Sequence, residues 1–141
     1  MAFTHLHVHT EYSLLDGSNK IKEYVARVKE LGMNSAAITD HGVMYGVIDF
    51  YRAAREAGIK PILGCEVYVA PNSRFDKELT GGEDRYHHLV LLAENNTGYA
   101  NLMKIVSRGF TEGYYYKPPC GHGSAAGVPR GNYRIVCLPC R

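Results

Sequence analysis

Histidine and carboxylate side chains recur along this chain, each beside or within a short apolar run. One His-X-His pair is weak evidence for a metal site, but several such groups at the ends of successive strand-like segments are stronger evidence. A metal ion needs ligands that converge from several segments, and a parallel barrel collects the ends of its strands at one mouth. The sequence therefore predicts a multi-metal hydrolase site. The residues that predict it are, in chain order, His7, His9, Asp40, His41, Glu66 and His88.

The first candidate pair, His7 and His9, lies at the end of an expected strand over residues 3–8. Side chains two residues apart on a strand point to the same face, so both rings could reach one ion at the usual zinc–imidazole distance of about 2.0–2.1 Å. A pair of surface or hydrogen-bonding histidines is the alternative, and it is the commoner meaning of an isolated pair. His5 shares the expected face, and we expect it to pack or to orient a ligand.

The second candidate group is Asp40 and His41, which close another expected strand before Gly42. The glycine permits a tight turn, so His41 would project toward the mouth of the barrel. We expect Asp40 to line the site or orient a ligand, and we count it as a candidate catalytic residue. A turn in which Asp40 caps the backbone is the alternative, but it does not account for His41.

Glu66 is the most informative single residue, because it interrupts an apolar strand between Cys65 and Val67. An ionised carboxylate is costly to bury unless it is paired or binds a metal. A carboxylate can also bridge two cations, so Glu66 is a candidate metal ligand and catalytic residue. Cys65 alternates away from it and is expected to be a packed thiol.

Two further candidate ligands come from a strand start and a loop. His87 and His88 begin an expected strand, and only one of them can face the barrel interior; we expect it to be His88. Asp16 precedes Gly17 in the loop after the first expected strand and could be another ligand. An ordinary turn aspartate is an equally good interpretation of that pattern.

Strand-like and helix-like segments alternate along the chain. Apolar residues at helical spacing predict three helices, the first capped by Ser18 and the first two ended by Gly32 and Gly58. Four strand–helix units, of which the third has a polar loop over residues 71–86, predict an α/β fold with a parallel sheet, equivalent to half a barrel. The expected strands cover residues 3–8, 35–39, 61–69 and 88–93, and the expected helices cover 18–31, 43–57 and 98–109.

Size and charge set limits on the function. A chain of 141 residues suits one domain, and its net charge of +2 does not indicate a nucleic-acid binder. No apolar run approaches the roughly 20 residues needed to span a bilayer, and the N-terminus does not resemble a secretory signal. We therefore expect a cytoplasmic location and no membrane partner.

Three long motifs carry a resemblance to a known family. HLHVHTEYSLLDG, ITDHGVMYGVIDFYRAAREAGIKPILGCEVYVAP and YHHLVLLAENNTGYANLMKIVSRGFTEGYYYKP resemble the PHP (polymerase and histidinol phosphatase) domain, in the form found at the N-terminus of the alpha subunits of bacterial replicative DNA polymerases of the C family. The likeness implies a distorted barrel of seven βα units that binds up to three metals and hydrolyses phosphoesters. In some of these polymerases the domain is a 3′–5′ proofreading exonuclease.

The resemblance also implies residue roles. It places His7 and His9 on one metal, His41 at the site with Asp40 beside it, Glu66 as the bridging carboxylate, and His88 as a further ligand. The family often has a histidine in the loop where this chain has Leu15 and Asp16, and Asp16 would substitute for it. Two or three divalent ions are implied, and mixed histidine and carboxylate ligation suits Zn²⁺, Mn²⁺ or Fe²⁺.

The same resemblance implies partners and rival functions. In the full-length polymerase the partners would be DNA and other replicase subunits, and nucleotide transfer would belong to later domains. A non-catalytic, metal-stabilised scaffold that docks a proofreading subunit is one alternative. A stand-alone phosphatase acting on histidinol phosphate is another, although the polymerase-like motifs argue against it. Later ligands of the family's site are missing, so we expect this chain alone to be inactive.

The last residues differ from everything before them. Residues 1–118 carry the resemblance, whereas residues 119–141 lack periodicity and hold Cys120, Cys137 and Cys140. One Cys-X-X-Cys pair without a second is weak evidence for a metal site. Codons permitted for this tail, read one nucleotide out of register, allow a continuation that resembles the family. The tail is therefore expected to be non-native and the product of a shifted reading frame.

Overall fold

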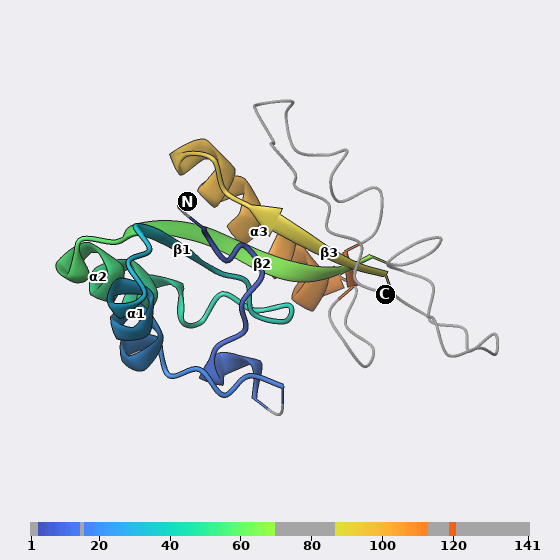
Figure 1. The fold of residues 1–141 in the computed structure, drawn as a ribbon. Coiled ribbons are helices and arrows are strands. Elements are labelled where there is room, and N and C mark those ends of the chain that lie inside the picture. Colours follow the sequence, from blue (N-terminus) through green and yellow to red (C-terminus); the bar gives the residue numbers. More distant parts are fainter. Residues whose placement is uncertain (1–2, 15, 70–86, 113–118, 121–141) are drawn as a thin grey trace.

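The fold is a small mixed sheet with helices packed against it (Figure 1). The computed structural model describes residues 3–14, 16–69, 87–112 and 119–120. The strand order is β1-β2-β3, and β4 also pairs with β2. The predicted polar loop over residues 71–86 and most of the predicted non-native tail lie outside the described residues. The strands are β1 (Ser35–Ile38), β2 (Lys60–Val69), β3 (His87–Leu92) and β4 (Pro119–Cys120).

The three predicted helices are confirmed, with shifted ends. They are α1 (Ile21–Glu30), α2 (Val47–Ala57) and α3 (Asn96–Glu112), and a short 3-10 helix, η1 (Glu11–Ser13), precedes them. Gly58 adopts a left-handed conformation (φ 77°) and ends α2 as predicted. The predicted cap at Ser18 is wrong, because α1 begins later and Lys20 occupies its N-cap without a side-chain hydrogen bond. None of the helices in the described ranges is both long and apolar enough to cross a membrane.

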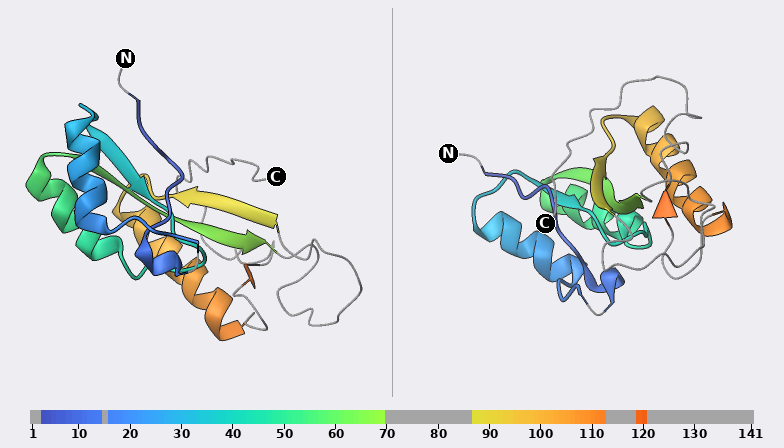
Figure 2. Two further views of the ribbon diagram at one scale, coloured as in Figure 1. Left: turned by 60° about the horizontal axis from the view of Figure 1, so that its bottom comes forward. Right: turned by 90° about the vertical axis from the view of Figure 1, so that its right-hand side faces the viewer.

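The helices cover one face of the sheet (Figure 2). Ile38 and Leu63 pack with α1 and α2, and Cys65 and Val67 pack with Leu102 of α3. Because side chains alternate along a strand, Glu66 points to the opposite face from Cys65 and Val67. The prediction that Cys65 is a packed thiol is confirmed, since it is fully buried in this core.

The direction of the third strand corrects the sequence prediction. β1 and β2 are parallel, as expected, but β3 is antiparallel to β2 and pairs Tyr68 with His88 and Glu66 with Val90. The apolar pattern could not reveal this, because Leu89 and Leu91 face the helices whichever way the strand runs. The direction matters for His88. In a parallel strand, the first residues would lie beside the start of β2, far from Glu66.

The expected strand over residues 3–8 is also corrected. Residues 3–10, here called the N-terminal segment, run beside β1 but form no regular ladder with it. Only two backbone hydrogen bonds join them to β1 and the residue that follows it: Ala37 N–H donates to the His5 carbonyl at 3.1 Å, and Thr39 N–H donates to the Val8 carbonyl at 2.9 Å. The segment is therefore extended yet irregular, and side chains hold much of it.

Candidate metal centre

Glu66 lies at the centre of the site, and the backbone of its neighbours fixes its position. Its N–H donates to the Asp40 carbonyl at 3.0 Å, and its carbonyl accepts from Gly42 N–H at 2.7 Å. These bonds make a parallel bridge between Glu66 and His41 just beyond the end of β1. Gly42 adopts φ 63°, a conformation that suits glycine, so the chain can turn away immediately after His41. The Glu66 side chain is only 1% exposed.

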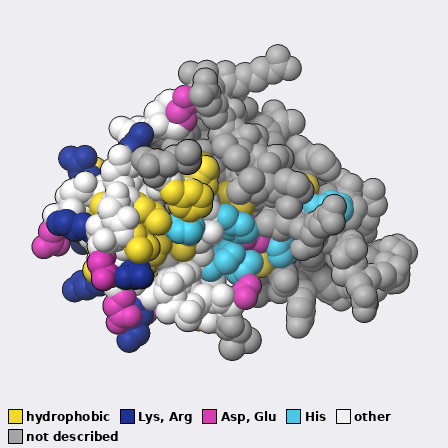
Figure 3. Space-filling model, viewed as in Figure 1, with side chains coloured by type: hydrophobic (Ala, Val, Ile, Leu, Met, Phe, Trp, Pro, Cys, Tyr) yellow, Lys and Arg dark blue, Asp and Glu magenta, His cyan; other side chains and the backbone are white. Residues whose placement is uncertain are grey.

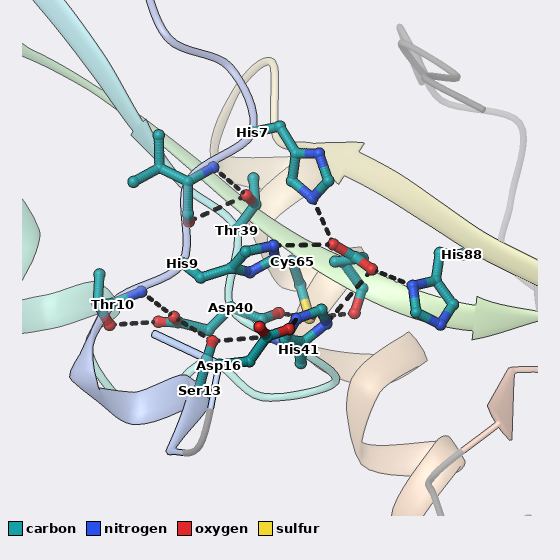
Figure 4. Close-up of polar contacts among 12 residues, drawn as sticks. His7, His9, Thr10, Ser13, Asp16, Thr39, Asp40, His41, Cys65 and His88 are labelled. Carbon is teal, nitrogen blue, oxygen red and sulfur yellow. Dashed lines mark hydrogen bonds and ion pairs between the residues drawn. The ribbon is translucent and has the colours of Figure 1, made fainter. Parts of the chain in front are cut away.

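The first ligand group is His7, His9 and Glu66. The Nε2 atom of His7 donates a short hydrogen bond to Glu66 Oε2. His9 Nε2 lies 3.3 Å from the same oxygen. Both histidines come from the N-terminal segment, and the structure brings them together at Glu66 (Figure 4).

The second ligand group is His41, Glu66 and His88. His88 Nδ1 lies 2.5 Å from Glu66 Oε1, and His41 Nδ1 lies 3.3 Å from that oxygen. His88 reaches it because antiparallel pairing with Tyr68 places it diagonally opposite Glu66 on the same face. Glu66 thus presents one oxygen to each pair of imidazoles, and in each group the candidate ligand atoms lie within 4.8 Å of one another.

The charges in the site are divided unequally between the histidines. The His9 and His41 rings are stacked, with centroids 3.9 Å apart. Burial lowers the pKa of His9, and the charge of His41 lowers it further. The Glu66 carboxylate raises the pKa of His41 in spite of burial. Burial alone would raise the pKa of Glu66, but the contacts from His41 and His7 outweigh it and hold that pKa at about 2.

The donor set fits divalent cations. Among the described residues, His9 Nδ1 is buried without a hydrogen-bond partner, and the contact of the buried His41 Nδ1 is the 3.3 Å approach to Glu66 Oε1, which lacks good hydrogen-bond geometry. Buried polar atoms are normally satisfied, so an unpartnered imidazole nitrogen beside an ionised carboxylate calls for an explanation. Neutral imidazole and carboxylate are ligands for Zn²⁺, Mn²⁺ and Fe²⁺. The site therefore has the composition of a metal centre with one shared carboxylate.

Asp16 lies at the rim of this centre and belongs to neither ligand group. Its Oδ2 lies 2.7 Å from His41 Nε2, and its side chain is 73% exposed. The structure thus brings Asp16 to a candidate ligand. Direct ligation by Asp16 stays a prediction.

Asp40 is held in a separate buried network. Its carboxylate accepts from Thr10 N–H at 2.5 Å, Thr10 Oγ1 at 2.7 Å and Ser13 Oγ at 2.6 Å. Asp40 is 1% exposed and belongs to neither ligand group. These contacts fasten the residues that follow His9, which is the role of a residue that orients a ligand. Among the described residues, no contact between the Asp40 carboxylate and a candidate ligand side chain supports the predicted catalytic role.

Sequence reasoning missed the hydroxyl side chains that support the ligands. Thr10, Ser13 and Thr39 bond to Asp40 or to the N-terminal segment. A signal was available for two of them, because a buried aspartate needs donors and hydroxyls close to the first histidine pair could supply them. His5 lies outside both groups: it is exposed and meets Phe3 edge-on at 4.8 Å between ring centroids.

The site opens on one face of the molecule. Figure 3 shows histidine side chains gathered there around an acidic group, beside a patch of hydrophobic side chains. A cavity of about 450 Å³ adjoins them, lined in part by His7, His9, Asp16, Asn19 and Arg27. A substrate could therefore approach the candidate ligands from solvent.

Comparison with known proteins gives a consistent result. The family model for the PHP domain matches residues 5–126. DNA polymerase III subunit alpha of Treponema pallidum is 53% identical over 139 residues, which cover 98% of this chain and 12% of that protein. The chain thus spans about a tenth of the length of the curated relatives it matches.

Solved structures agree on the fold. An amidohydrolase from Chromobacterium violaceum, determined with bound sulfate and no metal, has a TM-score of 0.51 at 25% identity and covers 76% of this chain and 34% of its own. A candidate metal-dependent phosphoesterase from Bifidobacterium adolescentis has a TM-score of 0.50 at 21% identity, with coverage of 78% and 35%. These barrel-like neighbours support the predicted partial α/β barrel. From its motifs and from the extent of the family match, the chain belongs to the PHP domain family.

Proposed function

We propose that this chain forms part of a multi-metal phosphoesterase site. One observation carries the proposal: the two oxygens of the buried Glu66 carboxylate face two different pairs of imidazoles. A carboxylate in that position can be shared by two cations. When bound, divalent cations lower the pKa of a water molecule and stabilise charge on phosphoryl oxygens.

The residues of the chain would have distinct tasks in this site. His7 and His9 would hold one cation, His41 and His88 a second, and Glu66 both. Asp16 would orient His41 or provide a further ligand. Asp40, proposed from the sequence as catalytic, would act by fixing the loop after His9. Zn²⁺, Mn²⁺ and Fe²⁺ are the proposed ions, in a total of two or three.

The wider role that we propose is in DNA replication. The relatives named above are alpha subunits of DNA polymerase III, and this chain matches only a small part of them. In such a polymerase the site would act as a 3′–5′ proofreading exonuclease in the cytoplasm, with DNA and other replicase subunits as partners. Nucleotide transfer would belong to other domains, and this chain alone would be inactive.

A test needs the full-length polymerase and a matched control histidine. We expect Glu66→Ala to abolish bound metal, because both groups share Glu66, and His9→Ala to remove the metal of the first group only. Both variants should lose 3′ exonuclease activity. His87→Ala is the control, since His87 is exposed, adjoins His88 on β3 and lies outside both groups. An exonuclease rate unchanged by Glu66→Ala and His9→Ala would refute catalysis at this site.

Two other functions would give different results. A scaffold that docks a proofreading subunit would bind metal but show no exonuclease activity with any ion. A histidinol phosphatase would release phosphate from histidinol phosphate and leave DNA intact. The polymerase relatives argue against the phosphatase. The retained His7, His9, Glu66 and His88 argue against a scaffold, which need not keep them.

We also propose that the domain portion ends near residue 118 and that residues 119–141 come from a shifted reading frame. The featureless composition of this tail supports the proposal, and so does the family-like continuation in another frame. The family match runs to residue 126, and the Treponema pallidum relative aligns over 139 residues, so the coding DNA must decide the boundary. Codons that cannot encode the alternative continuation would refute the shifted reading frame.

A further inference from the structure

The N-terminal segment contains one residue more than a regular pairing with β1 allows. Its bonds join the His5 carbonyl to Ala37 N–H and the Val8 carbonyl to Thr39 N–H. The two donors are two residues apart in sequence, whereas the two acceptors are three residues apart. A regular parallel ladder would have used the His7 carbonyl in place of that of Val8. The extra residue is a bulge between His5 and Val8.

The bulge changes which histidines can serve the site. Alternation along a regular strand would have given His5, His7 and His9 a common face. The inserted residue breaks this alternation after His5, which is exposed and lies outside the ligand groups. His7 and His9, beyond the bulge, both reach Glu66 Oε2. The irregular backbone is thus what selects the ligand pair.

A second contact consolidates the break in the ladder. In a regular pairing the Ala37 carbonyl would accept from His7 N–H. It accepts instead from the Tyr24 hydroxyl of α1 at 3.1 Å. Because the Ala37 carbonyl already accepts this hydrogen bond, a regular ladder with His7 would add less stability.

One side chain replaces the missing ladder bonds. Val8 N–H donates to Thr39 Oγ1 at 2.8 Å, and that hydroxyl donates to the Val8 carbonyl at 3.1 Å. Together with the bond from Thr39 N–H, both polar backbone groups of Val8 are satisfied by a single residue. Thr39 is fully buried, so no water can take over these bonds. Val8 is the residue between the two ligands His7 and His9.

We propose that Thr39 is a positioning residue of the metal centre, whose hydroxyl holds the bulged backbone that aims His7 and His9 at Glu66. The proposal rests on the proposed function, since it concerns the affinity of the first ligand group. It assigns Thr39 no contact with metal or substrate. The hydroxyl is the feature that matters, because the methyl group of Thr39 could be supplied equally well by valine.

Four variants of the full chain separate the hydroxyl from the packing. Thr39→Val removes the hydroxyl and keeps the shape, whereas Thr39→Ser keeps the hydroxyl. Thr4→Val is the matched control, because Thr4 Oγ1 also contacts a residue of β1, Ser35 Oγ at 2.5 Å, but away from the ligands. Thr39→Ala serves as a second deletion of the hydroxyl if the valine variant does not fold. Circular dichroism establishes that each variant retains its helices.

The first measurement needs no metal. In the unsubstituted chain we expect the Val8 amide hydrogen to exchange slowly with solvent. We also expect NMR to show contact between the His9 and His41 rings, whose centroids lie 3.9 Å apart. Thr39→Val should accelerate that exchange and remove the ring contact, whereas Thr39→Ser and Thr4→Val should preserve both. Retention of both signals in Thr39→Val and Thr39→Ala would overturn the proposal.

The second measurement is a titration with Co²⁺ alone. Removing a group that orients a ligand typically lowers metal affinity about 10–100-fold, and we expect that loss at one of two binding steps in Thr39→Val. Thr39→Ser should restore the affinity; equal losses in the serine and valine variants would show a packing role and overturn the proposal. If the unsubstituted chain binds no Co²⁺, the proposed function fails, and the metal-free ring contact still decides the role of Thr39.

Discussion

The two halves of the metal centre reach the same carboxylate by different structural means. His41 and His88 are placed by the sheet: one follows β1 in a backbone bridge to Glu66, and the other is set by the register of β3. His7 and His9 lie on a segment with only two backbone hydrogen bonds to its neighbouring strand. Side chains hold that segment, chiefly those of Thr39 and Asp40.

The difference teaches where the site is sensitive to substitution. Backbone ladder bonds survive most changes of side chain, so the second ligand group depends mainly on its own two histidines and Glu66. The first group depends in addition on a hydroxyl and a carboxylate that touch no metal. Substitution of residues that are not ligands can therefore disrupt the geometry of the first group.

The largest effect should come from Glu66→Gln, because both halves share this residue. The substitution keeps the shape but removes the negative charge between four imidazoles. Since loss of an orienting partner costs about 10–100-fold in metal affinity, loss of a shared ligand should cost at least about 100-fold at both steps. Isothermal titration with Zn²⁺ measures this. Loss at one step alone would show that Glu66 does not bridge the two halves.

Asp40→Asn should disable the first half and destabilise the fold. The Asp40 carboxylate accepts three hydrogen bonds, and an amide would turn a donor toward those donors. Loss of bonds to a buried charged group costs on the order of 3 kcal/mol, which urea unfolding can measure. Glu56→Gln, on the exposed side of α2, is the control and should change little. Equal stability of the two variants would remove Asp40 from its supporting role.

Single histidine substitutions should separate the two halves. We expect His7→Ala to weaken one metal-binding step and His88→Ala the other, because each residue belongs to only one ligand group. Metal content after dialysis would then fall to about half in each variant, whereas His5→Ala would keep the full content. Identical loss of all metal in both variants would show that the halves bind as one unit.

The smallest effect should come from Tyr24→Phe, which frees the Ala37 carbonyl beside the bulge. Loss of this one hydrogen bond costs about 1 kcal/mol at neutral pH. Burial raises the pKa of Tyr24 to about 12, above its ordinary value near 10. The neutral phenol is thus favoured in the folded state, and its stabilising contribution is complete below pH 10 and falls as the pH rises toward about 12.

Urea unfolding at a series of alkaline pH values checks this sign. The decline above pH 10 that comes from Tyr24 should be absent in Tyr24→Phe and present in Tyr51→Phe, whose tyrosine is exposed on α2. A decline of equal size in both variants would mean that Tyr24 titrates normally.

Much of the fold was predictable because local chemistry decides it. Helical spacing of apolar residues gave the three helices, and Gly58 ended α2 where expected. The prediction of Ser18 as the N-cap was wrong. Several polar residues near the start of a helix can act as the N-cap, and the observed N-cap, Lys20, makes no side-chain hydrogen bond. The predicted parallel direction of residues 88–93 was wrong for another reason: alternation of apolar residues is the same in both directions.

Residue types alone predicted the chemistry of the candidate centre. A carboxylate in the apolar strand of Glu66 and histidines near strand ends called for cations, and that demand follows from the cost of burying charge. Which histidines meet was a matter of tertiary structure. The antiparallel register brings in His88, and one extra residue opposite β1 brings in His7 and His9 and leaves out His5. Hydrogen bonds between segments far apart in sequence make those choices, and no local pattern contains them.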